Sequence, residues 1–224
     1  MLVSVEAWVF GLLIAKEWYS SILAPLFLSS SLSSGLSLMI LLLWLLKKKM
    51  SFRVAERAFD KLYGALAVIL CIDAFFIICE IVTMLYPGAS GAETAKVILF
   101  GSLAPLFWFE AIAGLVLPIL AFAIPKLRAK KGLPIAACGL VLLGVACKRL
   151  WLLLSGYSIP NIVGGNGITL GNQNVIAANG GNIWSTVGVY SATVPEVLIS
   201  IGVVAFGVLA FIVLMSKLSS KDPE

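Results

Sequence analysis

The stretch LCIDAFFIICEI, from Leu70 to Ile81, decides the fold class of this chain. It lies inside an apolar run from Leu66 to Tyr86, and a helix that crosses a bilayer needs about 20 apolar residues. Two acids, Asp73 and Glu80, interrupt the run. A charged side chain at the bilayer centre costs about 3 kcal/mol, so acids in such a run are candidates for function.

The composition of the whole chain is that of an integral membrane protein. Of the 224 residues, 61% are hydrophobic and 12% are charged, whereas a soluble domain is about half apolar and about a quarter charged. Backbone polar groups in lipid must be hydrogen-bonded within the segment, and the alternating pattern of a membrane β-barrel is absent. The sequence therefore predicts an all-α fold, a polytopic transmembrane helical bundle.

Five apolar segments are predicted to cross the membrane within a bundle that covers residues 22–218. Residues 1–21 are predicted to form an interfacial or short membrane segment, or a sixth span, and residues 219–224 a polar tail. Pro105 and Pro118 are expected to kink the third span, because proline removes a helix hydrogen bond. The predicted spans are 22–46, 58–86, 95–124, 133–154 and 194–218.

Basic residues predict the orientation of the bundle. They gather in two short loops, 47–57 and 126–131, which fall on the same side of five spans as the C-terminal lysines. Because Lys and Arg accumulate in cytoplasmic loops, that side is predicted to be cytoplasmic. The net charge of +5 is thereby explained without a nucleic-acid partner. The turn YPGASGAET at 86–94 and a loop at 155–193 are then predicted to face outward. The loop at 155–193 has no charged residue. Loops of such length are often functional.

The residue types that bind redox metals are scarce. Histidine is absent, and the four cysteines form no C-x-x-C pair. Membrane haem is usually ligated by His, and iron–sulfur clusters by grouped Cys, so neither is expected in this chain. The cysteines are interpreted as packing residues, since buried Cys behaves as a small hydrophobe. Any redox chemistry is then expected to use an organic cofactor or a partner chain.

Three buried acids are predicted to form a proton path. Asp73 and Glu80 are seven residues apart, which is about two helical turns, so they share one face of the second span. Glu110 lies near the middle of the third span. Asp73 and Glu110 are expected to have no basic residue at their own depth, and so to be protonated or in contact with internal water.

Three further charged residues lie nearer the predicted outer surface. Lys148 and Arg149 fall in the outer part of the fourth span, and Glu196 near the start of the fifth. They are predicted to form an outer ionic cluster that tunes the acids. The alternative is purely structural: Glu80 or Glu196, paired with Lys148 or Arg149, would hold the helices together.

Four stretches of the chain carry distinctive motifs: EWYSSILAPLFLSSSLSSG (17–35), FWFEAIAGLVLPILAFAIPKLR (107–128), GVACKRLWLL (144–153) and VYSATVPEVLISIGVVAFGVLAFIVLMSKL (189–218). The first has a Trp and a Pro before a small-residue run ending in Ser-Gly. The second has an acidic helix followed by Pro and a basic loop, the third a helix with an outer Arg, and the fourth a last helix with Tyr, Pro and an acid. Together they resemble the NrfD family of polysulfide-reductase-like membrane subunits. Family members usually have two four-helix bundles, and this chain resembles their C-terminal part.

The resemblance implies a membrane subunit of a multi-subunit respiratory oxidoreductase, located in the cytoplasmic membrane of a prokaryote. Such a subunit anchors an iron–sulfur subunit and a catalytic subunit at the outer face and exchanges electrons with the quinone pool. Menaquinone or another quinone is the implied cofactor, and a second membrane chain would supply the missing bundle and could share the quinone. The loop at 155–193 would then be a docking surface. Two other functions stay open: a cation- or proton-coupled transporter component that uses the same acids, and a purely structural anchor.

Overall fold

The computed structural model describes residues 2–13, 20–49, 56–86, 89–130, 132–158 and 193–219, and within these ranges every regular element is a helix. Five helices are long and apolar enough to cross a membrane. The predicted all-α transmembrane fold is therefore confirmed. The chain divides into two units, residues 1–188 and residues 189–224, and each is described by itself.

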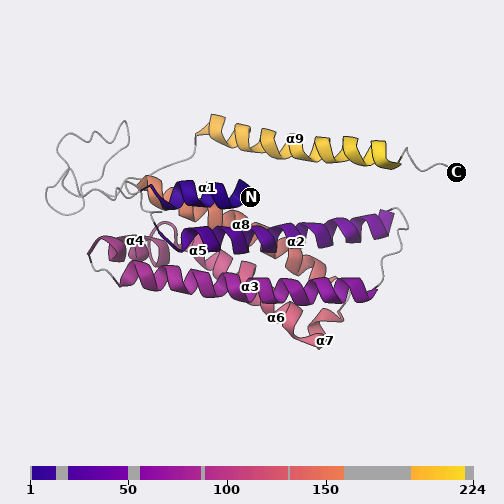
Figure 1. Cartoon of the computed structure of the whole chain (residues 1–224), viewed down its shortest axis with the longest axis horizontal. Coiled ribbons are helices and arrows are strands. Elements are labelled where there is room, and N and C mark those ends of the chain that lie inside the picture. The colour runs from indigo at the N-terminus through magenta and orange to yellow at the C-terminus, as the bar shows by residue number, and fades with distance from the viewer. Residues whose placement is uncertain are drawn as a thin grey trace. The chain divides into compact units, whose positions relative to one another are not determined.

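The first unit contains a four-helix bundle (Figure 1). Its members are α2 (Leu23–Lys49), α3 (Glu56–Leu85), α8 (Leu133–Ser158) and a composite third helix. Each member contacts the next along the chain, and α8 also contacts α2, so the four close into a ring. Short connections make such neighbours antiparallel. The core of the ring is apolar; its fully buried side chains include Ile40, Leu66, Leu70, Phe122 and Val141.

The composite third helix begins later than the sequence predicted. Instead of one span over 95–124, α4 (Ala89–Leu99) ends in a turn at residues 100–103, and the membrane-crossing segment then runs from Ala104 to Ala123. That segment consists of α5 (Ala104–Trp108), the π-helix η1 (Phe109–Val116) and α6 (Leu117–Ala123). The predicted turn at 86–94 is correspondingly too long, because α4 begins inside it, at Ala89.

Both prolines of this segment lie next to a boundary between two of its helical elements. Pro105 stands in the first turn of α5, the position proline favours because the N–H it lacks has no helical partner there. Pro118 stands at the second residue of α6, inside a continuous helical segment, where proline removes a helix hydrogen bond. Pro118 directly follows the π-helix, whose wider turns often mark functional positions. The two expected kink points are thus a helix start and the end of a π-helix.

The π-helix and α8 touch backbone to backbone. A Cβ atom added to Gly114 would lie 2.7 Å from the Cα of Gly144, and one added to Gly144 would lie 2.5 Å from the Cα of Gly114. Small residues allow such close approach of helices in membranes. This contact fixes the height of the third helix against α8.

The end of the bundle that carries α4 also carries α1 (Leu2–Gly11). Helix α1 packs on α2; Ala7 is fully buried, and the ring of Phe10 lies 6.4 Å from that of Phe27. Ten residues make a helix of about 15 Å, half the thickness of the hydrocarbon core. Whether residues 1–21 enter the membrane stays a prediction.

The opposite end of the bundle is the basic one. Helix α2 continues to Lys49 and α3 starts at Glu56, so the first basic loop is shorter than predicted. The second basic loop contains the short helix α7 (Pro125–Arg128), whose Arg128 donates from Nε and Nη2 to the carbonyl oxygen of Phe122.

The second unit contains α9 (Val194–Ser219), close to the predicted fifth span. Its start is capped, because the backbone N–H of Thr193 donates to Oε2 of Glu196 at 2.8 Å, a capping-box bond. Residues 159–192, most of the predicted outer loop, lie outside the described residues, whereas residues 155–158 belong to α8.

Candidate functional site

A lysine between two carboxyl groups lies in the interior of the bundle. The Nζ atom of Lys148 is 2.6 Å from Oδ2 of Asp73 and 3.1 Å from Oε1 of Glu110. The side chains of all three residues are at most 2% exposed. We call these three residues the buried triad; they join α3, η1 and α8.

The helix geometry explains why the triad forms. Glu110 stands one turn before Gly114, and Lys148 stands one turn after Gly144. Because η1 and α8 are antiparallel and touch at these glycines, their side chains one turn away fall at the same level. Asp73 reaches the same level from α3, on the face that buries Leu70 and Ile77.

Two further side chains complete the hydrogen bonding of the acids. The hydroxyl of Ser29, on α2, lies 2.6 Å from Oδ1 of Asp73 and 3.0 Å from the carbonyl oxygen of Leu26, and its one proton serves one of them at a time. The indole Nε1–H of Trp151 donates to Oε2 of Glu110 at 2.6 Å. All four helices of the bundle therefore contribute to one polar network. Oε1 of Glu110 is buried and, although 3.1 Å from Lys148, it accepts no hydrogen bond of acceptable geometry.

The expectation that Asp73 and Glu110 lack a basic residue at their depth is wrong. Helix α8 extends to Ser158, beyond the predicted end of the span, so Lys148 lies deeper than its place in the predicted span suggested. The long aliphatic stem of a lysine then carries the ammonium to the acids. Lys148 therefore contacts two of the predicted proton-path residues, Asp73 and Glu110, and its role in an outer cluster stays a prediction.

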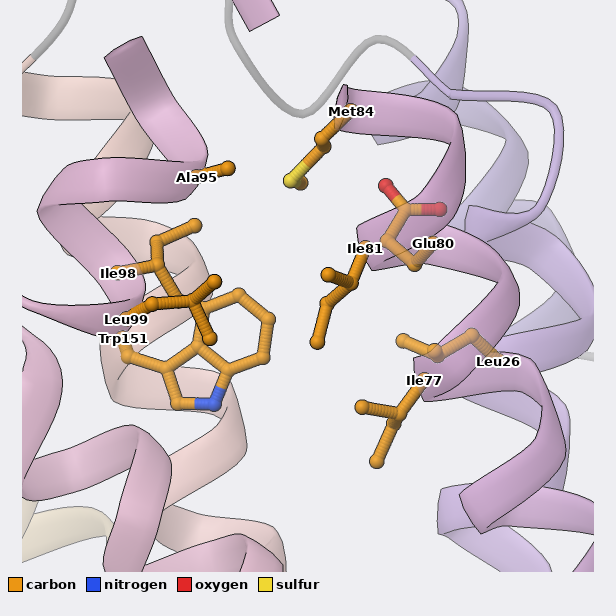
Figure 2. Close-up of a pocket in the computed structure, with 9 residues that line it drawn as sticks. All are labelled: Leu26, Ile77, Glu80, Ile81, Met84, Ala95, Ile98, Leu99 and Trp151. Carbon is orange, nitrogen blue, oxygen red and sulfur yellow. The ribbon is translucent and has the colours of Figure 1, made fainter. Parts of the chain in front are cut away.

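Glu80, the third predicted path residue, lines a separate small cavity (Figure 2). As predicted, it shares a buried face of α3 with Asp73; it is 5% exposed, and its Oε2 accepts a hydrogen bond from the Ser20 hydroxyl at 2.8 Å. The space inside the cavity is about 10 Å³, room for about one water molecule. In Figure 2, residues of α3 face residues of α4 and the indole of Trp151 across it. Its lining is Leu26, Ile77, Glu80, Ile81, Met84, Ala95, Ile98, Leu99 and Trp151.

Trp151 connects the cavity with the triad. Its ring forms part of the cavity wall, while its Nε1–H is bonded to Glu110. The ring is 3% exposed and meets Phe107 edge-on, with centroids 5.7 Å apart. A group in the cavity would therefore be one side chain away from the buried carboxyl of Glu110.

The other two predicted outer-cluster residues have different surroundings. Arg149 turns toward α2, where its Cζ lies 3.8 Å from the centre of the Phe27 ring and its Nη2 donates to the Ser31 hydroxyl at 3.1 Å. Glu196 caps α9 in the second unit, so its distance from Lys148 and Arg149 is not described. Its membership in an ionic cluster stays a prediction.

The charges of the triad determine what it can do. One ammonium balances one carboxylate, and an unbalanced charge is costly in a dry interior. The triad is therefore neutral when its two carboxyl groups share one proton. Asp73 holds the ammonium at the shorter distance and in a hydrogen bond, which leaves Glu110 as the carboxyl suited to gain and lose that proton.

Several residues of this network carried no functional prediction. Ser29 lies in a serine-rich stretch that indicates helix packing, and Trp151 and the two glycines are common in membrane helices. The sequence feature that could have indicated them is spacing. Lys148 and Trp151 are three residues apart, and Gly114 and Gly144 are each four residues from a charged residue of the triad. Residues at these spacings share a helix face. Among the described residues, no group of three or more His, Cys, Asp or Glu side chains could hold a metal ion.

Comparison with known proteins identifies the family. The sequence model described as "Polysulphide reductase, NrfD" matches residues 1–161. The chain belongs to the NrfD family. The match includes the whole four-helix bundle and α1, and it ends before α9.

Three similar proteins are all membrane or other subunits of reductases. The chain is 26% identical to a putative dimethyl sulfoxide reductase membrane subunit of Halobacterium salinarum, over 92% of this chain and 47% of that protein. It is 34% identical to a selenate reductase subunit of Mesobacillus selenatarsenatis, over 69% and 36%. It is 36% identical to a polysulfide reductase chain of Wolinella succinogenes, over 60% and 43%.

The aligned part covers less than half the length of each of these curated relatives. No solved structure matches the chain. Membership in the NrfD family and five apolar helices identify an integral membrane protein.

Proposed function

We propose that this chain is a membrane subunit of a reductase complex, that it exchanges electrons with the quinone pool, and that its buried acids carry the accompanying protons. The family match and the reductase relatives support the first part. The observation that carries the rest is the arrangement around Trp151, with a small cavity on one side and the buried carboxyl of Glu110 on the other.

The lining of the cavity suits the chemistry of a quinone. A quinone head is a flat, mainly apolar ring with polar oxygens at its edge, and the cavity offers apolar side chains, an indole face and the single carboxyl of Glu80. The space as it stands is about 10 Å³, room for about one water molecule, so a quinone head would enter only by moving α3 and α4 apart. When bound, a quinone supplies two-electron, two-proton chemistry. The residues that would hold it are Trp151, Glu80, Ile77 and Met84.

The chain's own acids then have separate tasks. Glu80 holds a proton at the wall of the cavity, and Ser20 fixes its carboxyl by the hydrogen bond to Oε2. Glu110 holds a proton behind the wall, and Trp151 fixes its orientation. The ammonium of Lys148 lies against both carboxyl groups and stabilises the carboxylate that Glu110 leaves when it gives up its proton, and Ser29 supports Asp73.

The orientation of the chain is part of the proposal. The cavity is at the end of the bundle that carries α4, and the basic loops are at the opposite end. With the basic loops in the cytoplasm of a prokaryotic cell, the cavity opens toward the outer face. An iron–sulfur subunit and a catalytic subunit would dock there, and a second membrane chain would complete the quinone site.

A structural role for the triad is the second candidate, because the ion pairs do tie α3, η1 and α8 together. The two functions differ in what a neutral replacement does. Glu110→Gln keeps the shape of the side chain and an oxygen for the Trp151 bond, yet it holds no exchangeable proton. A structural pin tolerates this change, whereas a proton carrier does not.

The test is turnover of the chain together with the proteins that co-purify with it, driven by a water-soluble quinol or quinone. We expect Asp73→Asn and Glu110→Gln to slow turnover by tenfold or more, because a positioned proton carrier contributes about 10²–10⁴-fold, while the set of co-purifying subunits is unchanged. Glu6→Gln, an exposed acid on α1, is the control and should retain full turnover. Full turnover in both triad variants would contradict the proton role. A chain that purifies alone and without extractable quinone would contradict the subunit role.

A further inference from the structure

A second and larger cleft lies at the basic end of the bundle, opposite the cavity at Trp151. It has about 1560 Å³ of open volume. It is bounded by the end of α2, the start of α3, the segment around α7 and the start of α8. Its lining is Trp44, Lys47, Phe59, Asp60, Tyr63, Pro125, Arg128, Ala129, Lys130, Gly132, Pro134 and Ile135. Neither the proton path nor the ion pairs of the bundle use these residues.

The charge in this basic-end cleft is positive on balance. Three basic residues, Lys47, Arg128 and Lys130, line it with one acid, Asp60. Arg128 is held in place by its two bonds to the carbonyl of Phe122, so its guanidinium is presented in a fixed position. Lys130 forms no ion pair with any other described residue and is exposed.

Tyr63 also lines the cleft and can offer its hydroxyl group to a ligand. The ring of Tyr63 is buried and stacks on Phe122 with centroids 5.6 Å apart, which fixes the position of its hydroxyl. No described residue hydrogen-bonds that hydroxyl. The start of α8, at Gly132 and Pro134, contributes the positive end of a helix dipole. Cations, a hydroxyl donor and a helix start together form a surface that suits a phosphate group.

The depth of the cleft suits a lipid rather than a soluble phosphate. The lining combines the charged ends of the spans with Trp44 and Tyr63, amphipathic aromatic residues of the kind that mark the level of lipid headgroups. Phe59 and Ile135 add apolar surface. Basic pockets between helix ends on the cytoplasmic side are known to hold anionic headgroups. We propose that the basic-end cleft binds the phosphate headgroup of an anionic phospholipid, with the apolar wall against the glycerol and the first methylenes of its chains.

The test is a titration of the purified full chain in neutral detergent, followed by native mass spectrometry. The probes are phosphatidylglycerol and phosphatidylcholine with the same acyl chains. The test variant is Lys47→Gln/Lys130→Gln. Its matched control is Lys61→Gln/Lys126→Gln, which removes two exposed lysines from the same end of the bundle that do not line the cleft. Both variants lower the general surface charge equally, so any difference between them comes from the cleft.

We expect phosphatidylglycerol to bind the natural sequence more tightly than phosphatidylcholine. We expect the cleft variant to bind it about 25-fold more weakly than the control variant, since each of its two basic residues near an anionic headgroup contributes roughly fivefold. Lys47→Arg/Lys130→Arg should restore binding and shows that loss in the Gln pair is not misfolding. Equal binding of the two variants, or no preference between the two lipids, would overturn the proposal. Glycerol 3-phosphate binding as tightly as phosphatidylglycerol would overturn it too, because the site would then take a soluble phosphate.

Discussion

Gly114 and Gly144 meet with no side chain between them, and this contact sets the distance between Glu110 and Lys148. A Cβ on either glycine would come within 2.7 Å of the other's Cα, which is closer than real Cβ atoms approach. The two charged residues stand one helical turn away, one on each helix, and their atoms are 3.1 Å apart. The polar network of the bundle interior therefore depends on a contact between two residues that have no polar side chain.

The first prediction concerns this crossing. Gly144→Ala should force η1 and α8 apart and destabilise the bundle by about 1–3 kcal/mol, the usual cost of overpacking. Denaturation of the purified chain in mixed micelles measures the change. Gly139→Ala is the control on the same helix, because a Cβ at Gly139 meets nothing within 4 Å; it should be neutral or slightly stabilising, since Ala favours helix more than Gly. Equal effects of the two changes would show that the crossing is not tight.

The number of membrane spans and the all-helical fold class could be predicted from sequence, because both depend on the length and apolarity of each segment. The run around Asp73 is long enough to span a bilayer and appears as α3, and the predicted fourth and fifth spans appear as α8 and α9 within a few residues at each end. The shared face of Asp73 and Glu80 also followed from their spacing. These features are local, so one segment at a time is sufficient to predict them.

The break between α4 and α5 and the partner of the acids could not be predicted in the same way. Apolar residues continue through Phe100 and Leu103, so hydropathy shows no end to the helix there. Lys148 was placed too near the surface because the end of α8 was put too early, and depth in a membrane is counted from helix ends. Which charged residues meet depends on the rotation and height of each helix, and here the contact of Gly114 with Gly144 sets the height.

The second prediction concerns the lysine of the triad. Lys148→Met should destabilise the bundle by about 3–5 kcal/mol, because two buried carboxyl groups lose their common cation. Lys148→Met/Asp73→Asn should recover part of that loss, since the carboxylate that the ammonium balanced is then neutral. Denaturant titrations of the single and double variants give both numbers. A double variant whose loss of stability equals or exceeds the sum of its two single changes would mean that Lys148 does not stabilise the acids.

The third prediction concerns Arg149. Its guanidinium lies over the Phe27 ring at 3.8 Å and donates to Ser31, and a lysine cannot reproduce a planar stack and that bond together. Arg149→Lys should therefore destabilise the chain by about 1 kcal/mol. In Phe27→Leu the same substitution should have a smaller effect, because the ring is already gone. Additive effects in this double-mutant cycle would show that the stack contributes nothing.

The last prediction separates the two functions of Trp151. Trp151→Phe keeps an aromatic ring in the cavity wall but removes the donor to Oε2 of Glu110. A buried carboxyl that loses its hydrogen bond costs about 1.5–3 kcal/mol, so the variant should be less stable by that amount. Trp108→Phe is the matched control, because its Nε1–H also has a partner, the Leu99 carbonyl, but that partner is neutral and Trp108 does not line the cavity. Its cost should stay below about 1 kcal/mol.

If Glu110 is the proton carrier, Trp151→Phe should also slow quinol-linked turnover, whereas Trp108→Phe should not. Loss of stability without loss of turnover would leave Trp151 a structural residue, and the link between the cavity and the triad would then have no role in the reaction.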